Sequence, residues 1–292
     1  MTAAVRVSWP VVAARALRTL LVLMRVAAAI RLACLPGRRP GSGERAYSAG
    51  ARALLRAVRV DLRIRPPAAR TDGAALIVAN HVSWLDILVL AASEPMVPVA
   101  KCEIAAWPVI GPVAGDLGAV FIDRSRLRAL PRTVDDMADA LREGRSVQVF
   151  PEATTRCGTA LDPFRRAAFQ AAIDARAPVR PVGVFYRDVT GRPTTATAFV
   201  GDQTVLSSVV TLLRGGPVTA TVAWAEPIAP PVSVRPAADR AILAHAAEQA
   251  VAAVLDQQVL TRPRRLTTAG PRNPGHSRPP ERPQVPPDPV SP

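Results

Sequence analysis

The sequence is poor in several residues that commonly form binding sites or covalent staples. It contains one lysine, Lys101, against 36 arginines, and only three histidines and three cysteines. The cysteines (Cys34, Cys102 and Cys157) are odd in number and have no paired spacing. That pattern argues against a disulfide framework and favours a reducing, cytosolic compartment, where the cysteines act as small buried hydrophobes. With so few histidines, one that stands in a defined pattern is a candidate functional residue.

The chain also lacks a long uncharged hydrophobic run. Residues 11–35 are apolar but are interrupted by arginines, so they fall short of the ~20 uncharged residues that a spanning helix needs. Arg25 also cuts the apolar stretch that a cleaved signal peptide would require. On a helical wheel Arg15, Arg18 and Arg25 lie on one side, and the other side is apolar (Leu17, Leu20, Leu23, Met24, Ala27 and Ile30). The pattern predicts a basic amphipathic helix lying in the membrane interface, with a surface helix packed on the body as the alternative.

The net charge of +14 is confined to the two ends of the chain. Residues 1–65 hold 13 Arg and two acidic residues, and residues 261–292 hold six Arg and two acidic residues. The body between them is nearly neutral, which argues against a nucleic-acid partner, since a nucleic-acid-binding fold carries its basic patch on the fold itself. An anionic membrane surface suits a basic, apolar N-terminus better.

The body alternates between strand-like and helix-like segments. Strand-like runs begin at 60–64 and recur at 74–79, 96–100, 118–122, 146–150, 179–186 and 218–224. Helix-like stretches follow at 84–92, 127–142, 164–175, 203–213 and 237–258, after a second amphipathic helix at 44–58. This alternation predicts an α/β fold with a mixed, largely parallel sheet flanked by helices. We expect a membrane-associating region at 1–65, one domain at 66–260 and a disordered, proline-rich tail at 261–292.

The segment from Asn80 to Asp86 carries the strongest chemical signal. His81 follows the buried run 74–79, and Ser83-x-x-Asp86 then opens a new apolar stretch. The order strand, turn and helix start is where α/β folds place reactive groups. A histidine with a carboxylate in reach is the pair that activates a hydroxyl. The alternative for Asp86 is a carboxylate that only caps the positive end of the helix.

Two more polar clusters follow strands. The run Gly118 to Ile122 leads into Asp123-Arg124, and Arg124 can bind a phosphate through its planar fork or form an ion pair with Asp123. The run 147–150 leads into Pro151, Glu152, and the hydroxyls of Thr154 and Thr155. A carboxylate directly after a buried strand favours binding. Lys101 is a compact charge suited to a phosphate or a carbonyl, with a surface strand end as the alternative.

Taken together, these clusters resemble the conserved blocks of the membrane-associated glycerolipid acyltransferases, the family of 1-acyl-sn-glycerol-3-phosphate acyltransferase. Asn80-His81 through Asp86 is similar to the His-x4-Asp block, and Gly118 through Arg124 to the block that ends in Phe-Ile-x-Arg. Phe150-Pro151-Glu152 resembles the start of the Phe-Pro-Glu-Gly-Thr-Arg-Ser block, and residues 177–182 the Val-Pro-rich block. The likeness covers about residues 74–186, with the four blocks in order.

The resemblance implies an O-acyltransferase in which His81 is the general base and Asp86 orients its imidazole. The substrate-binding residues it implies are Lys101, Arg124, Phe150, Pro151, Glu152, Thr154 and Thr155. The acyl donor would be acyl-CoA or acyl-carrier protein as co-substrate, with no other cofactor and no metal. The enzyme would work in phospholipid biosynthesis with membrane lipids and a lysolipid acceptor as partners, peripheral or monotopic at the cytoplasmic face of the cell membrane. The apolar segment 107–110 would line the acyl tunnel or simply form core.

The third block departs from the family pattern at two positions. Ala153 stands where glycine is usual, and Thr155 where arginine is usual. Alanine tolerates positive φ poorly, and Thr155 removes a charged fork that would hold an acceptor phosphate. The expected acceptor is 1-acyl-sn-glycerol-3-phosphate or another lysophospholipid, and the alternative is lyso-ornithine lipid, whose head group lacks phosphate. An alternative of another class is a non-catalytic membrane-binding protein of the same fold.

Overall fold

A computed structural model describes residues 7–67, 72–123, 126–153, 161–195, 197, 204–231 and 236–260. The folded unit extends to Leu260. Of the predicted substrate-binding residues, Arg124, Thr154 and Thr155 lie outside the described residues, as does the tail predicted to be disordered.

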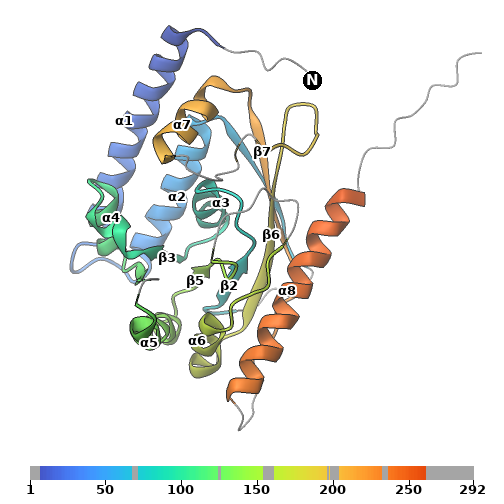
Figure 1. Cartoon of the computed structure of the whole chain (residues 1–292). Coiled ribbons are helices and arrows are strands. Elements are labelled where there is room, and N and C mark those ends of the chain that lie inside the picture. The colour runs from blue at the N-terminus through green and yellow to red at the C-terminus, as the bar shows by residue number, and fades with distance from the viewer. Residues whose placement is uncertain are drawn as a thin grey trace, which may run out of the picture. The chain divides into compact units, whose positions relative to one another are not determined.

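Helices and strands alternate along the chain, as the sequence pattern predicts (Figure 1). The helices are α1 (Trp9–Ala33), α2 (Ser42–Ala57), α3 (Leu85–Ser93), α4 (Ile110–Asp116), α5 (Leu130–Arg142), α6 (Ala167–Ala175), α7 (Val205–Arg214) and α8 (Pro236–Leu260), with short 3-10 turns η1 (Cys102–Ala106) and η2 (Leu127–Ala129). The strands are β1 (Val60–Arg65), β2 (Leu76–Ala79), β3 (Val97–Lys101), β4 (Val120–Ile122), β5 (Val147–Val149), β6 (Val179–Arg187) and β7 (Val218–Trp224).

The strands form one seven-stranded sheet in the order β1-β7-β6-β2-β5-β3-β4. Strands β6, β2, β5, β3 and β4 run parallel to one another, whereas β6 and β7 pair antiparallel and β1 runs parallel to β7. The predicted mixed, largely parallel α/β sheet is therefore confirmed. Because β2, β5, β3 and β4 are parallel neighbours, the loops after all four strands leave the sheet at the same edge. The described residues of the three polar clusters, among them His81, Asp123 and Glu152, follow strands that end at that edge.

Each face of the sheet is covered by helices over its own apolar cluster. Side chains of α2, α3 and α7 pack with one face, and side chains of α5, α6 and α8 with the other. In Figure 1, α8 lies on one side of β6 and β7, and α2, α3 and α7 lie on the other. The central strand β2 is buried along its whole length, because it is covered on both faces. The buried end of β2 therefore fixes the position of the residues that follow it.

Helix α1 packs on α2 and also contacts α4 and α7. Its inward side buries Val12, Ala27 and Ile30, and the guanidinium of Arg15 on the same side donates to the carbonyl oxygen of Leu213 at 2.6 Å. The helical wheel placed Arg15 on the outer polar side and Ala27 and Ile30 on the membrane side, which is wrong. Apolar residues surround most of α1, so contacts with α2 and α7 decide which side faces inward.

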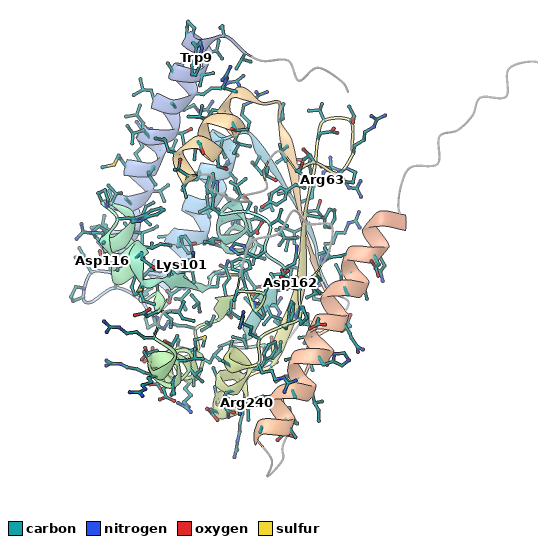
Figure 2. All side chains as sticks on the ribbon, viewed as in Figure 1. Trp9, Arg63, Lys101, Asp116, Asp162 and Arg240 are labelled. Atoms are coloured by element: carbon teal, nitrogen blue, oxygen red, sulfur yellow. The ribbon has the colours of Figure 1, made fainter. Side chains whose placement is uncertain are left out.

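A second apolar side of α1 stays exposed, and we call it the outer face of α1. It consists of residues that are 48–59% exposed (Leu17, Leu20, Leu21, Met24 and Leu32). In Figure 2 the helix that carries them runs along one side of the molecule, below the labelled Trp9. None of the helices, over the residues that the structure describes, is long and apolar enough to cross a membrane.

Candidate active site

Asn80 fixes the point at which the chain leaves the sheet after β2. Its side-chain amide donates to the carbonyl oxygen of Val184 at 2.9 Å, and its side-chain oxygen accepts from the amide of Val184 at 2.7 Å. The two bonds extend the pairing of β2 with β6 by one residue, made by a side chain in place of the backbone. His81 therefore follows a position that is held from both directions, at the carboxyl edge of the sheet.

Asp86, the second residue of α3, lies beneath His81 and is fully buried. Its Oδ2 accepts from the backbone amides of Val82 and Ser83 at 2.6 and 2.8 Å and lies 2.9 Å from His81 Nδ1. Its Oδ1 accepts from the hydroxyl of Tyr186 at 2.6 Å. The carboxylate thus caps the backbone at the start of α3 and also holds the imidazole, so both interpretations of Asp86 from the sequence describe the same group.

The contact with Asp86 determines which nitrogen of His81 is free. An ionised carboxylate only accepts hydrogen bonds, so the proton between the two groups belongs to Nδ1 of His81. The other ring nitrogen, Nε2, then carries a lone pair and can take a proton from a hydroxyl. The His81 side chain is 15% exposed, whereas that of Asp86 is not exposed at all. The arrangement is an imidazole with an available nitrogen beside a buried carboxylate, which is the geometry that a general base requires.

Phe150, directly after β5, fixes the plane of the imidazole from the neighbouring strand. The rings of Phe150 and His81 stack with centroids 4.0 Å apart and an angle of 13° between their planes. The hydrogen bond to Asp86 fixes one edge of the ring, and the stacked phenyl ring fixes its tilt. The phenyl ring of Phe150 therefore fixes the orientation of the imidazole. The sequence did not predict this contact.

Glu152 connects the loop after β5 to the loop after β2. Its Oε1 accepts from the backbone amide of His81 at 2.7 Å, and its Oε2 accepts from the backbone amide of Asp162 at 3.0 Å. The carboxyl is 4% exposed, and burial raises its pKa against the opposing effect of these two hydrogen bonds. The carboxyl of Glu152 thus holds the backbone of the loop after β2 at His81.

The chain turns sharply after Glu152. Pro151 is buried, and its carbonyl oxygen accepts from the amide of Arg165 at 3.0 Å. Ala153 has φ = 59°, the left-handed region that favours glycine. The glycine usual at this position is therefore explained by the backbone, and this chain adopts the same turn with an alanine.

Lys101 ends β3 and is exposed (Figure 2). It lies at the same sheet edge as His81, but β5 separates its strand from β2. At about 4.8 Å per strand, the two strands are about 10 Å apart, a distance that a phosphorylated substrate can bridge. The structure brings together His81, Asp86, Phe150 and Glu152 by direct contact, and it places Lys101 further along the edge.

Tyr186 is a site residue that the sequence argument missed. It is the eighth residue of β6, and its hydroxyl donates to Asp86 from the sheet. The available signal was weak: Tyr186 is one of two tyrosines, in alternation with Val182 and Val184 on the core-facing side. Nothing in a strand pattern distinguishes a tyrosine that packs from one that also donates a hydrogen bond.

Over the described residues, no group of three or more His, Cys, Asp or Glu is placed to hold a metal ion.

Comparison with known proteins shows which family the chain resembles. The family model described as Acyltransferase matches residues 59–185. A 1-acyl-sn-glycerol-3-phosphate acyltransferase from Neisseria gonorrhoeae is 38% identical over 177 residues, which cover 60% of this chain and 69% of the relative. A lyso-ornithine lipid O-acyltransferase from Pseudomonas aeruginosa is 37% identical over 199 residues, which cover 68% of this chain and 73% of the relative.

Among solved structures, the fold resembles the crystal structure of a 1-acyl-sn-glycerophosphate acyltransferase from Thermotoga maritima. The TM-score is 0.60, and the match covers 85% of this chain and 98% of that chain. Because only 18% of residues are identical, this likeness concerns the fold alone.

Proposed function

The chain belongs to the acyltransferase family and is an O-acyltransferase, and we propose that it acylates the free hydroxyl of 1-acyl-sn-glycerol-3-phosphate or a related lysophospholipid. The donor would be the thioester of acyl-CoA or acyl-carrier protein. The observation that carries the proposal is the His81–Asp86 pair, with Nε2 of a ring-stacked imidazole left available at the carboxyl edge of the sheet.

The proposed mechanism uses His81 as the general base. Nε2 of His81 takes the proton from the acceptor hydroxyl as its oxygen attacks the thioester carbonyl carbon. The new C–O ester bond forms, the C–S bond breaks, and the proton passes from His81 to the departing thiolate. Asp86 keeps the imidazole in the required tautomer and balances its positive charge while it carries the proton. The thioester is already activated, so the proposed step needs no metal or further cofactor.

Lys101 supports a phosphate-bearing acceptor. It is an exposed ammonium at the same edge as His81, and its strand β3 pairs with β4, the strand that precedes Arg124 in the sequence. We propose that both cations bind the acceptor phosphate, with Thr154 and Thr155 near the acceptor. Replacing Lys101 with alanine should raise KM for 1-acyl-sn-glycerol-3-phosphate about tenfold and change kcat little, since charge-assisted hydrogen bonds contribute about 1.5–3 kcal/mol. Equal KM values for variant and wild type would exclude Lys101 as a phosphate ligand.

Lyso-ornithine lipid is the second candidate acceptor. It is favoured by the Pseudomonas aeruginosa relative, whose similarity extends over more of this chain, and by Thr155 at a position usual for arginine. An acceptor without phosphate would need fewer cations at this edge. The two candidates differ only in the acceptor, and the acyl-transfer step would be the same.

A panel of acceptors tests the proposal. The purified protein is supplied with acyl-CoA and with 1-acyl-sn-glycerol-3-phosphate, lysophosphatidylglycerol or lyso-ornithine lipid, and thiol release and lipid product are measured. We expect the highest kcat/KM with 1-acyl-sn-glycerol-3-phosphate. A higher kcat/KM with lyso-ornithine lipid would make lyso-ornithine lipid the assigned acceptor. A parallel series with acyl-carrier protein in place of acyl-CoA identifies the donor. Binding of lipid without thiol release for every donor and acceptor would favour a non-catalytic membrane-binding protein.

We also propose that the protein docks on the cytoplasmic face of the membrane through the outer face of α1. This face offers half-exposed leucines and a methionine, flanked by the exposed Arg18 and Arg25. Apolar side chains that insert shallowly and cations that meet anionic head groups are the two contributions that hold an interfacial helix. Such docking would bring a lipid acceptor to the protein without a spanning segment.

A further inference from the structure

Tyr186 binds the catalytic pair from the side opposite the imidazole. Its hydroxyl donates to Oδ1 of Asp86 at 2.6 Å, while the other three donors to this carboxylate share Oδ2. Tyr186 is therefore the single described group that holds Oδ1. Without it, one oxygen of a fully buried carboxylate would have no hydrogen-bond donor among the described residues.

The phenol is suited to remain a donor throughout the working pH range. Tyr186 is 4% exposed, and burial, together with the negative charge of Asp86, raises its pKa well above the usual value. A protonated phenol beside a carboxylate withdraws electron density from it through a short, charge-assisted hydrogen bond. The same carboxylate faces the imidazole through Oδ2.

We propose that Tyr186 is a positioning residue that acts through Oδ1 of Asp86 and, by sharing the negative charge of this carboxylate, lowers the proton affinity of His81. The proposal rests on the proposed role of His81 as general base. A base is most effective when it is unprotonated at the working pH but still accepts the proton of the substrate. A phenol that shares the charge of Asp86 weakens the attraction between this carboxylate and a protonated imidazole.

Among the residues that the structure describes, Asp86 and Glu152 bond to His81 directly, and Tyr186 acts on it through Asp86. Asp86 comes from α3, Tyr186 acts through Asp86 from β6, and Glu152 comes from the loop after β5. Glu152 binds the backbone amide of His81 and leaves the ring to Asp86 and the Phe150 stack. Removing the Tyr186 hydroxyl therefore changes the environment of the imidazole only through Asp86.

The direction of the change distinguishes this role from simple packing. If Tyr186 shares the charge of Asp86, its loss concentrates that charge on Oδ2, and the protonated imidazole persists to higher pH. If Tyr186 only keeps the carboxylate in place, its loss weakens the His81–Asp86 contact, and the protonated imidazole is lost at lower pH. The two roles predict shifts of opposite sign.

The test compares Tyr186→Phe with Tyr47→Phe. Tyr47, the other tyrosine, belongs to α2, and burial raises the pKa of its phenol as well. The titration of His81 is followed by the NMR signal of its Cε1 proton, which His81→Ala identifies by its disappearance. Because this measurement needs no substrate, it tests Tyr186 even if His81→Ala retains activity and the proposed function fails.

We expect Tyr186→Phe to move the His81 titration midpoint upward by about half a pH unit to one pH unit. The acid limb of the kcat/KM profile should move with it, which lowers kcat/KM about three- to tenfold at pH values below the limb and changes the plateau little. Tyr47→Phe should leave both profiles unchanged. An unchanged or lowered midpoint in Tyr186→Phe overturns the proposal.

Discussion

The His81 corner and the outer face of α1 depart from the usual distribution of residues in opposite ways. The His81 corner consists of His81, Asp86, Phe150, Glu152 and Tyr186. In the corner, charged and polar groups are buried, yet Asp86 and Glu152 each have a hydrogen bond on both oxygens. On the outer face of α1, leucines and a methionine are half exposed to solvent. The first departure is compensated inside the chain, because each buried carboxylate meets its own donors. The exposed side chains on the outer face of α1 are not covered by any of the described residues.

The difference separates what the chain does alone from what it does with a partner. The geometry of His81 depends on backbone amides, a phenol and a phenyl ring, all supplied by this chain. It should therefore persist in detergent or with a soluble acceptor. The outer face of α1 gains stability only when something apolar covers it. Substitutions in the two regions should consequently affect different measurements, turnover for one and lipid binding for the other.

The largest expected effect comes from removing the base. His81→Ala should lower kcat by about 10²–10⁴-fold, the contribution typical of a positioned general base. Membrane binding should remain at the wild-type level, because His81 is not part of the outer face of α1. His245→Ala is the matched control, since His245 is exposed on α8 and contacts Gln249. A folded His81→Ala protein with wild-type turnover would contradict the mechanism.

The next effect concerns the outer face of α1. Replacing Leu20 and Met24 with aspartate should weaken binding to anionic vesicles about tenfold or more, because two half-inserted side chains are lost and two negative charges are added. Sedimentation with vesicles measures it. Ile242→Asp on α8 is the control, since Ile242 is 63% exposed on a different helix. Deleting α1 would be a poorer test, because Val12, Ala27 and Ile30 of α1 are part of the buried core.

The sequence predicts the elements of the fold more completely than the contacts between them. All seven strand-like runs correspond to strands in the structure, because uninterrupted apolar runs and alternation mark strands locally. The reversed direction of β1 and β7 relative to the other strands had no local signal, since it depends on long-range pairing. The short helix α4 was also not predicted, because Gly111 and Pro112 interrupt its sequence pattern.

The site shows the same division between local and long-range information. His81 and Asp86 are five residues apart, so their pairing could be predicted from a turn followed by a helix start. Tyr186 lies 100 residues from Asp86, and Glu152 lies 71 residues from His81. The sequence predicted a binding role for Glu152 but not that its oxygens take backbone amides. Such contacts depend on strand order, which a motif does not contain.

A smaller effect concerns the pH dependence of stability. Burial raises the pKa of Glu152 in the folded state, so its stabilising contribution is fully present below the unfolded value of about 4.3 and is lost as pH rises through the folded value. Glu152→Gln has no such titration. The free energy of unfolding of wild type minus that of Glu152→Gln should therefore fall as pH rises from about 4 to 7. Chemical denaturation at a series of pH values measures this difference, and a difference that rises with pH would contradict the assignment.

The smallest effect concerns backbone strain in the loop that holds His81. Ala153 has φ = 59°, where a Cβ costs about 1–2 kcal/mol, although a glycine also gives the unfolded chain more freedom. Ala153→Gly should therefore stabilise the protein by about 0.5–1 kcal/mol, which raises Tm by about 1–4 °C in a domain of this size. Ala253→Gly, at an exposed position within α8, should have the opposite sign, because glycine costs about 1 kcal/mol inside a helix. If both substitutions lower Tm equally, Ala153 is not strained. If only Ala153→Gly raises Tm while turnover stays constant, Ala153 is strained and His81 does not depend on that strain. The contacts of Glu152 then hold the loop in place with either residue at position 153.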